Sequence, residues 1–427
     1  MMLFFLFGSL FFLLLMSVPV AYALGVSSLI IFFAEGLHPS IAFQRMISGM
    51  AIYSLIAVPF FIFAGELMLR GGIAERLVKL ALAIFGRVRG GLGVVNVMSS
   101  MIFGGISGSA VADTSAIGSM MIPMMKKAGY HTDYAVNVTV TSSIAGVVIP
   151  PSHNMILFAL AAGGTVSIAD LFVAGVIPGI LMSIMLATAA YLVAVRRGYP
   201  KAEFPGFSAL FGLIIGTIPG LLTGVIIVGG VLSGIFTVTE SAAIGVAYAL
   251  VIIGVLYRRL TPNMLWESLV ATARTSGLVI ILVGSASMFA YLLAFYRAPE
   301  LVINSLLALS DNRVIILLMI NLALLVFGTF MDMAGLILIV TPIFLPVAVR
   351  LGMDPTQFGI LMMMNLGLGL TTPPVGACLF VGCSIGKIRI EETVKTIVPF
   401  YFAILATLMA VTFIPQLSLW LPSLLNH

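Results

Sequence analysis

The chain has 427 residues, of which 61% are hydrophobic and only 8% are charged, and its mean hydropathy is +1.22. Soluble domains carry about a quarter charged residues, so this composition excludes a soluble helical protein and makes a lipid bilayer the solvent. The net charge of +5 comes from small scattered basic groups, which mark loop ends at a membrane and not a nucleic-acid surface. We therefore expect an all-α polytopic membrane protein that contacts lipid and has no nucleic-acid partner.

The first apolar segment, residues 2–34, is longer than one straight span. At ~1.5 Å per residue it would measure about 51 Å, against a hydrocarbon core of about 30 Å, so it is strongly tilted or broken near Pro19. Its apolar run continues past Ala23, and the first Lys or Arg in the chain is Arg45. We expect a retained membrane segment and not a cleaved signal peptide, which would need a basic N-terminal region.

Further apolar segments follow almost without pause along the rest of the chain. They are 51–69, 77–86, 91–105, 110–125, 134–149, 154–163, 171–195, 207–231, 236–257, 276–296, 301–309, 314–329, 333–350, 357–371, 376–386 and 396–421. Several contain only about 10–16 residues, which is too short for a straight span. The short ones flank clusters of Gly, Pro, Ser and Thr, a pattern typical of half-helices and re-entrant hairpins.

Two Pro-Pro pairs interrupt these apolar segments at matching places. The pairs at 150–151 and 373–374 lie 223 positions apart (373 − 150), and "IPMMKKAG" at 122–129 matches "LPVAVRLG" at 345–352 with the same offset. The matches predict two repeats, 1–204 and 205–427, each with scaffold helices followed by a hairpin and a broken helix, at 96–179 and 321–400. Two halves with broken segments at corresponding positions are typical of a secondary transporter.

Two non-helical stretches in each half carry the candidate chemistry: 103–115 and 145–154, then 327–335 and 368–377. Each pair combines hydroxyls, glycines and one acid. Broken helices expose carbonyls at one end and N–H groups at the other, which suit a dehydrated Na⁺ and a substrate carboxylate. A proline has no N–H to donate, so the carbonyls four residues earlier are candidate ion ligands: Gly146, Val147, Gly369 and Leu370. The alternative is a simple kink satisfied by Ser or Thr.

Acids inside a membrane are functional candidates by default, and the two stretches contain Asp113 and Asp332. They either organise an ion site or cap the helices that follow. Glu66 is interpreted as structural, because Arg70 lies four residues later on the same expected helix. Glu240 is a candidate for helix capping or for coupling.

The polar residues after the first Pro-Pro pair are candidate substrate contacts. For His153, a hydrogen-bonded loop histidine is favoured over proton coupling. The full set of candidate substrate-binding residues is Ser152, His153, Asn154, Ser109 and Thr114.

The polar stretches resemble the large membrane subunit of tripartite ATP-independent periplasmic (TRAP) transporters. They are "FGGISGSAVADTSAIGSMMIPMM" (103–125), "IPPSHNMILFALAAGGTVSIADLFVAGVIPG" (149–179), "TVTESAA" and "TPPVGACLFV", and the resemblance covers essentially the whole chain. It implies two inverted-topology repeats with broken helices and re-entrant hairpins, similar to the ion transporter superfamily, that work as an elevator in the bacterial inner membrane.

The resemblance also implies partners and ligands. A small membrane subunit of about four spans would accompany this chain, a periplasmic binding protein would deliver an organic acid, and a Na⁺ gradient would drive its uptake. Carried onto this sequence, one Na⁺ site would use Ser107 and Ser109 with the backbone of Gly146, Ile149 and Pro151. The second would use Gly328, Thr329, Gly369, Thr372 and Pro374. Asp113 and Asp332 would support the two sites.

One departure from the family pattern bears on the substrate. After "IPPS" many dicarboxylate-type members resemble an Ile-Pro continuation, whereas this chain has His153-Asn154. The more polar sequence favours sialic acid, with a C4-dicarboxylate or a keto acid next.

Two other functions compete with this interpretation. A membrane-embedded enzyme would need an acid–base or metal cluster, and the four histidines are widely scattered, so we expect no enzyme. A stand-alone ion-coupled anion transporter or exchanger without a binding protein is compatible with the sequence.

Overall fold

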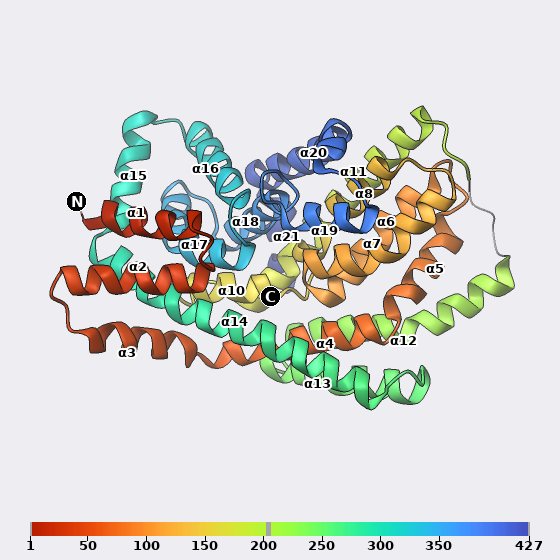
Figure 1. Ribbon diagram of the computed structural model, residues 1–427, viewed down its shortest axis with the longest axis horizontal. Helices are drawn as coiled ribbons and strands as arrows, with labels where there is room; N and C mark the ends of the chain where they lie inside the picture. The colour runs from red at the N-terminus through yellow and green to blue at the C-terminus, as the bar shows by residue number, and fades with distance from the viewer. Residues whose placement is uncertain (1, 202–205, 426–427) are drawn as a thin grey trace.

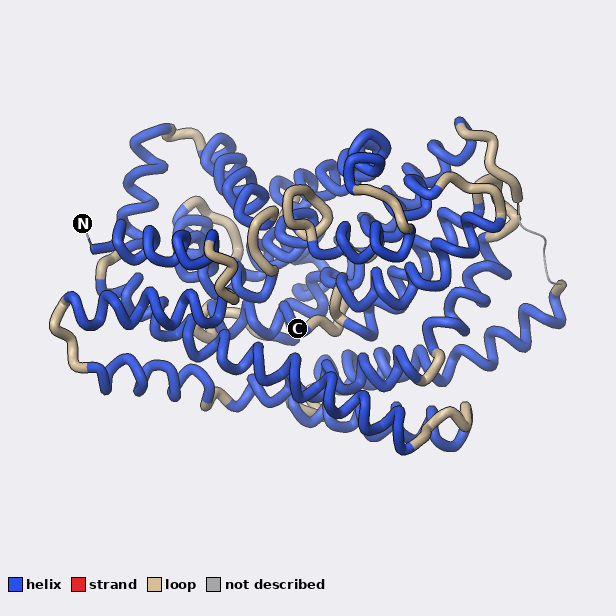
Figure 2. Tube along the Cα trace, viewed as in Figure 1, coloured by secondary structure: helices blue, strands red, loops and turns tan. Residues whose placement is uncertain are grey.

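A computed structural model describes residues 2–201 and 206–425, and helices make up most of these ranges (Figure 2). No strand occurs within them. The expected division of the chain at residues 204 and 205 falls outside the described residues.

Residues before the gap form twelve helical elements. They are α1 (Met2–Leu15), α2 (Val20–Ala34), α3 (Pro39–Met50), η1 (Tyr53–Ile56), α4 (Ala57–Arg70), α5 (Ile73–Phe85), α6 (Gly91–Ser107), α7 (Ala110–Lys127), α8 (Thr132–Ser142), α9 (Ala145–Val148), α10 (His153–Ala161) and α11 (Ile168–Arg196).

Residues after the gap form eleven. They are α12 (Phe207–Leu232), α13 (Val238–Val251), η2 (Ile252–Leu256), α14 (Pro262–Phe295), α15 (Ala298–Leu309), α16 (Arg313–Gly328), α17 (Met333–Arg350), α18 (Pro355–Gly369), α19 (Ala377–Gly386), α20 (Ile390–Phe413) and α21 (Gln416–Leu425).

Local side-chain chemistry explains several helix starts. At α13, Thr237 and Glu240 form a capping box: the Thr237 N–H donates to the Glu240 carboxylate at 2.8 Å, and the Glu240 N–H donates to the Thr237 hydroxyl at 3.3 Å. Of the two roles expected for Glu240, capping is the one that its contacts serve. On α4, the expected pair is confirmed, since Arg70 Nε donates to Glu66 at 3.2 Å.

The structure confirms one expected break and departs from other expected segments. The segment 2–34 is broken at Pro19 into α1 and α2, which pack against each other. The last expected segment, 396–421, is also broken, at Pro415. Helix α3 was not expected, and α14 begins at Pro262 although its apolar run begins only at 276.

The described ranges contain seven helices that are long and apolar enough to cross a membrane. The number is eight if α8, α9 and α10 count as one broken span. This multi-span, all-helical architecture confirms the expected fold class.

The helices form a layer and a body. Helix α14 packs against α2, α3 and α4, and α13 packs against α4 and α12. These six helices, the scaffold layer, run along one edge of the molecule (Figure 1). Helices α6–α11 and α16–α20 pack on one another and make up the hairpin body.

Within the hairpin body, elements far apart in the sequence pair crosswise. Helix α7 packs against α19, and α17 packs against α10. Each hairpin therefore packs its second helix against the helix that follows the break in the other half of the chain.

Candidate transport site

The first hairpin, α6–α7, turns at Ser107, Gly108 and Ser109, which we call the first tip. Gly108 has φ +62°, and a Cβ there would lie 2.9 Å from the Pro151 carbonyl oxygen, so only glycine fits. The Ser109 hydroxyl caps α7 by accepting from the Ala112 N–H at 3.3 Å. The first tip thus lies directly against the broken helix of the same half.

Residues 149–152 form the first break, across which the helix axis changes direction by 53°. Two glycines allow α6 to reach this break. A Cβ on Gly104 would lie 2.0 Å from the Gly146 Cα, which means that the backbones of α6 and α9 touch. The close approach places the backbone of the break beside the tip.

The second hairpin, α16–α17, repeats these features at residues 329–332, the second tip, and residues 370–376, the second break. A Cβ on Gly369 would lie 2.5 Å from the Gly328 carbonyl carbon. The Val375 N–H donates to the Thr329 carbonyl at 3.2 Å, which joins tip and break. Both Pro-Pro pairs contain a cis peptide bond.

The two breaks differ in which of their carbonyls accept a backbone hydrogen bond. At the second break, the Gly369 carbonyl accepts from the Thr372 N–H and the Leu370 carbonyl accepts from the Cys378 N–H, both at 3.0 Å. Each of these carbonyls therefore has one backbone donor and keeps a second lone pair, because the chain turns back on itself after the helix ends. At the first break, the prolines give Gly146 and Val147 no N–H at the usual helical position.

The two acids also differ in position. Asp332 caps α17 by accepting from the Ala334 N–H at 3.1 Å, and it is exposed. Asp113 lies one turn inside α7, fully buried, because Ser109 takes the capping position. Neither Asp113 oxygen has a hydrogen-bond partner within 3.5 Å, although the Ser100 hydroxyl faces it from α6.

The oxygens around the first tip fit a hard cation. Buried side-chain oxygens without a hydrogen-bond partner include both of Asp113, the Thr114 hydroxyl and the Ser152 hydroxyl. A buried carboxylate without a partner is costly, and hydroxyl and carboxylate oxygens are the ligands that hard cations prefer. At the second tip and the second break, the Thr329 and Thr372 hydroxyls each donate to a helix carbonyl at 2.8 Å and keep lone pairs for a cation.

A cavity of about 620 Å³, the tip cavity, lies where the scaffold layer meets both tips. Helices α2, α4 and α14 line one side of it. On the other side, Ser107 and Ser109 come from the first tip, His153 from the start of α10, and Asp332 from the second tip. A smaller cavity of about 60 Å³ joins Ser109, His153 and Asp332 to Asn154. Residues of both halves therefore meet in one place.

The candidate substrate residues do not all reach this space. Ser109 and His153 line the tip cavity, and Asn154 lines only the smaller one. Thr114 and Ser152 are buried, and neither lines these two cavities.

Three polar residues of the tip cavity were not expected from the sequence. Glu66 lines the cavity besides pairing with Arg70, and Thr275 and Ser115 line it from α14 and α7. Thr275 lies just outside the apolar run that begins at 276, and Ser115 lies within the Gly- and Ser-rich stretch, so only the second had a sequence signal.

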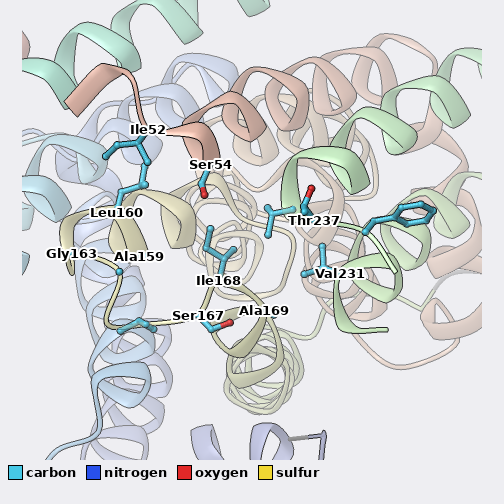
Figure 3. Close-up of a pocket in the computed structure, with 14 residues that line it drawn as sticks. Ile52, Ser54, Ala159, Leu160, Gly163, Ser167, Ile168, Ala169, Val231 and Thr237 are labelled. Carbon is cyan, nitrogen blue, oxygen red and sulfur yellow. The ribbon is translucent and has the colours of Figure 1, made fainter. Parts of the chain in front are cut away.

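A second cavity of about 580 Å³ lies between the end of α10, the start of α11, η1 and the α12–α13 turn (Figure 3). The hydroxyls of Ser54, Ser167 and Thr237 are among its lining groups. It contains none of the residues expected to bind an ion or substrate.

A family model described as "Tripartite ATP-independent periplasmic transporter, DctM component" matches residues 7–417. The sialic acid TRAP transporter large permease SiaM of Vibrio cholerae is 36% identical, over 96% of each chain. The 2,3-diketo-L-gulonate permease YiaN of Escherichia coli is 35% identical over 93% of this chain and 94% of its own. The C4-dicarboxylate permease DctM of V. cholerae is 35% identical over 96% and 95%.

Among solved structures, the YdaH transporter of Alcanivorax borkumensis matches with a TM-score of 0.65 at 12% identity, over 89% of this chain and 88% of its own. This likeness concerns the fold alone. The relatives are named as transporter permeases, so the chain is a transporter component and not an enzyme. By the match of the family model over nearly its whole length, the chain belongs to the DctM family, the large membrane permeases of tripartite ATP-independent periplasmic transporters.

Proposed function

We propose that this permease imports an organic acid across the bacterial inner membrane, in which it lies, by coupling the acid to Na⁺. Na⁺ is bound at the two tips, and the acid is bound in the tip cavity. The observation that carries the proposal is that both tips and the scaffold layer line one cavity. An ion bound at a tip then lies beside the substrate and balances its charge.

The ion sites comprise the residues of each tip and break. The first uses Ser107, Ser109 and Asp113 with the backbone of Gly146, Ile149 and Pro151. The second uses Gly328, Thr329, Asp332, Gly369, Thr372 and Pro374. Support comes from the unpartnered oxygens of Asp113 and from the contacts between each tip and its own break.

The two sites belong to two inverted repeats, residues 1–204 and 205–427. Helices α17 and α18 begin 223 positions after α7 and α8 (333 − 110 and 355 − 132). Helix α7 packs on α19, and α17 packs on α10. A pseudo-two-fold axis that relates the two halves would produce this pair of equivalent contacts. The hairpin body moves as an elevator against the scaffold layer.

The favoured substrate is sialic acid, followed by a C4-dicarboxylate or a keto acid. Overall similarity does not choose among them, since the identities to the three named permeases differ by one percentage point. His153 and Asn154 carry the choice, because they place an imidazole and an amide beside the cavities, where a hydroxyl-rich acid finds hydrogen-bond partners.

The partners are a small membrane subunit of about four spans and a periplasmic binding protein, in line with a family description that calls the transporter tripartite. Reconstitution in liposomes tests the proposal. We expect uptake of labelled sialic acid only with both membrane subunits, the loaded binding protein and an inward Na⁺ gradient.

Uptake that persists when K⁺ replaces Na⁺ would overturn the coupling. Uptake without the binding protein would favour a stand-alone transporter or exchanger instead. Succinate and 2-oxoglutarate serve as the comparison substrates.

A further inference from the structure

The tip cavity has little positive charge for a site that binds an organic acid. Among the described residues that line it, the ionisable ones are Glu66, His153 and Asp332, and none is a lysine or an arginine. A substrate carboxylate in this space faces two other carboxylates. Bound Na⁺ offsets part of this repulsion, and a basic group at the edge of the cavity would offset more.

Arg70 is such a basic group. It lies one turn beyond Glu66 and directly after Leu69, and both of these residues line the cavity. Its Nε donates to Glu66 at 3.2 Å, and its Nη1 donates to Glu267 of α14. The guanidinium therefore joins α4 to α14 next to residues that line the tip cavity, although Arg70 is not itself one of them.

The two acids do not hold Arg70 equally. The Glu66 side chain is 25% exposed and lies on the same helix as Arg70, whereas the Glu267 side chain is 61% exposed. Exposed ion pairs contribute about 0–1 kcal/mol, so the contact with Glu267 is easily given up. A guanidinium binds carboxylates in pairs of parallel hydrogen bonds. An incoming substrate carboxylate can therefore bind the N–H groups of Arg70 that Glu267 releases.

We propose that Arg70 is a substrate-binding residue at the edge of the tip cavity, where its guanidinium exchanges Glu267 for a carboxylate of the transported acid. Glu66 holds the guanidinium in place during the exchange. The inference rests on the proposed function only in that the substrate is an organic acid. It adds a scaffold residue to a site otherwise built from the tips.

A second ion cluster in the same region provides a matched control. Arg259 donates to Glu75 at 3.2 Å with side chains 48% and 40% exposed, and neither these two residues nor their chain neighbours line the tip cavity. Hydrogen bonds from Lys79 and Arg259 lower the pKa of Glu75, so this acid is charged at neutral pH. Changes to this cluster alter a similar pair without touching the cavity.

The test is equilibrium binding of labelled sialic acid, succinate and 2-oxoglutarate to the purified complex of both membrane subunits, at constant saturating NaCl. We expect Arg70→Lys to raise the Kd of the bound acid about fivefold, because the paired hydrogen bonds are lost. Glu267→Gln lowers the Kd about threefold, since a competing carboxylate is removed. Arg259→Lys and Glu75→Gln leave it unchanged.

Gel filtration and thermal unfolding of each complex confirm that the variants are folded, and Arg70→Lys retains the positive charge beside Glu66 and Glu267. Equal Kd values for wild type, Arg70→Lys and Glu267→Gln would overturn the inference while leaving the proposed function intact. If wild type binds none of the three acids, the proposed function fails and the inference fails with it.

Discussion

Ser109 and Asp332 occupy corresponding places in the two hairpins, 223 positions apart (332 − 109), and both cap the helix that follows. The sequence suggested a different correspondence, between the acids Asp113 and Asp332. The difference arises because a cap is fixed by where the backbone becomes helical, which residue type alone does not reveal. One hairpin thus presents a hydroxyl at its tip and buries its acid, while the other presents the acid itself.

The proposed ion sites predict the effect of removing single hydroxyls. Ser107→Ala and Thr372→Ala each remove one ligand oxygen, so we expect the Na⁺ concentration for half-maximal uptake to rise severalfold. Ser119→Ala provides the control. The Ser119 hydroxyl donates to the Ala116 carbonyl of α7 at 2.9 Å and belongs to neither tip. Uptake measured over a range of Na⁺ concentrations checks this, and unchanged Na⁺ dependence in both variants would remove these residues from the sites.

At the scale of the element, the contact between α6 and α9 depends on glycines. Their backbones touch at Gly104 and Gly146, as those of α16 and α18 do at Gly328 and Gly369. Small residues let helices approach this closely in a membrane, where packing and not the hydrophobic effect holds them together. Each crossing places a break beside its tip.

A methyl group at this crossing has no room. We expect Gly104→Ala to destabilise the protein by about 1–3 kcal/mol, as overpacking of a tight interface does. Gly277→Ala on α14 meets no atom within 4 Å and is neutral or stabilising. The thermal unfolding midpoint of the purified complex measures both changes, and a Gly104→Ala midpoint equal to that of Gly277→Ala would contradict the close packing.

The breaks could be predicted because proline acts locally: it removes a donor wherever it stands. Helix α3 and the first turns of α14 could not be predicted by searching for apolar runs, because Arg45, Glu267 and Arg274 make these stretches too polar. The tip cavity could not be predicted from the sequence either. Glu66 lies 87 residues from His153 (153 − 66), the nearest other ionisable lining residue along the chain, and only the packing of α4 on α14 brings it there.

Over the whole molecule, the scaffold layer and the hairpin body meet around the tip cavity, and the elevator proposal requires them to move past each other. Contacts across this boundary join α14 to α17 and α4 to α6. Contacts inside the scaffold layer, such as those of α2 with α14, need not change during this movement.

Engineered disulfides can test whether these two kinds of contact behave differently during transport. A Cβ on Gly335 of α17 would lie 3.5 Å from the Val20 Cβ of α2, a spacing that suits a disulfide. We expect Val20→Cys with Gly335→Cys to stop uptake on oxidation and to recover it on reduction.

Gly25→Cys with Ser285→Cys provides the control within the scaffold layer, where the corresponding distance is 3.8 Å. This pair is expected to retain uptake when oxidised. Full uptake by the first pair with its cross-link formed would show that the two parts do not move relative to each other.

The 34 residues of α14 have a further consequence. A helix of this length measures about 51 Å, well beyond a hydrocarbon core of about 30 Å, so it is strongly tilted or extends past the core. Its tilt then depends on bilayer thickness, and Arg70 and Glu267 tie that tilt to α4 at the edge of the tip cavity. Lipid chain length would thus act on the proposed substrate site from outside the protein: we expect liposomes of shorter or longer acyl chains to change the affinity of the tip cavity for the acid.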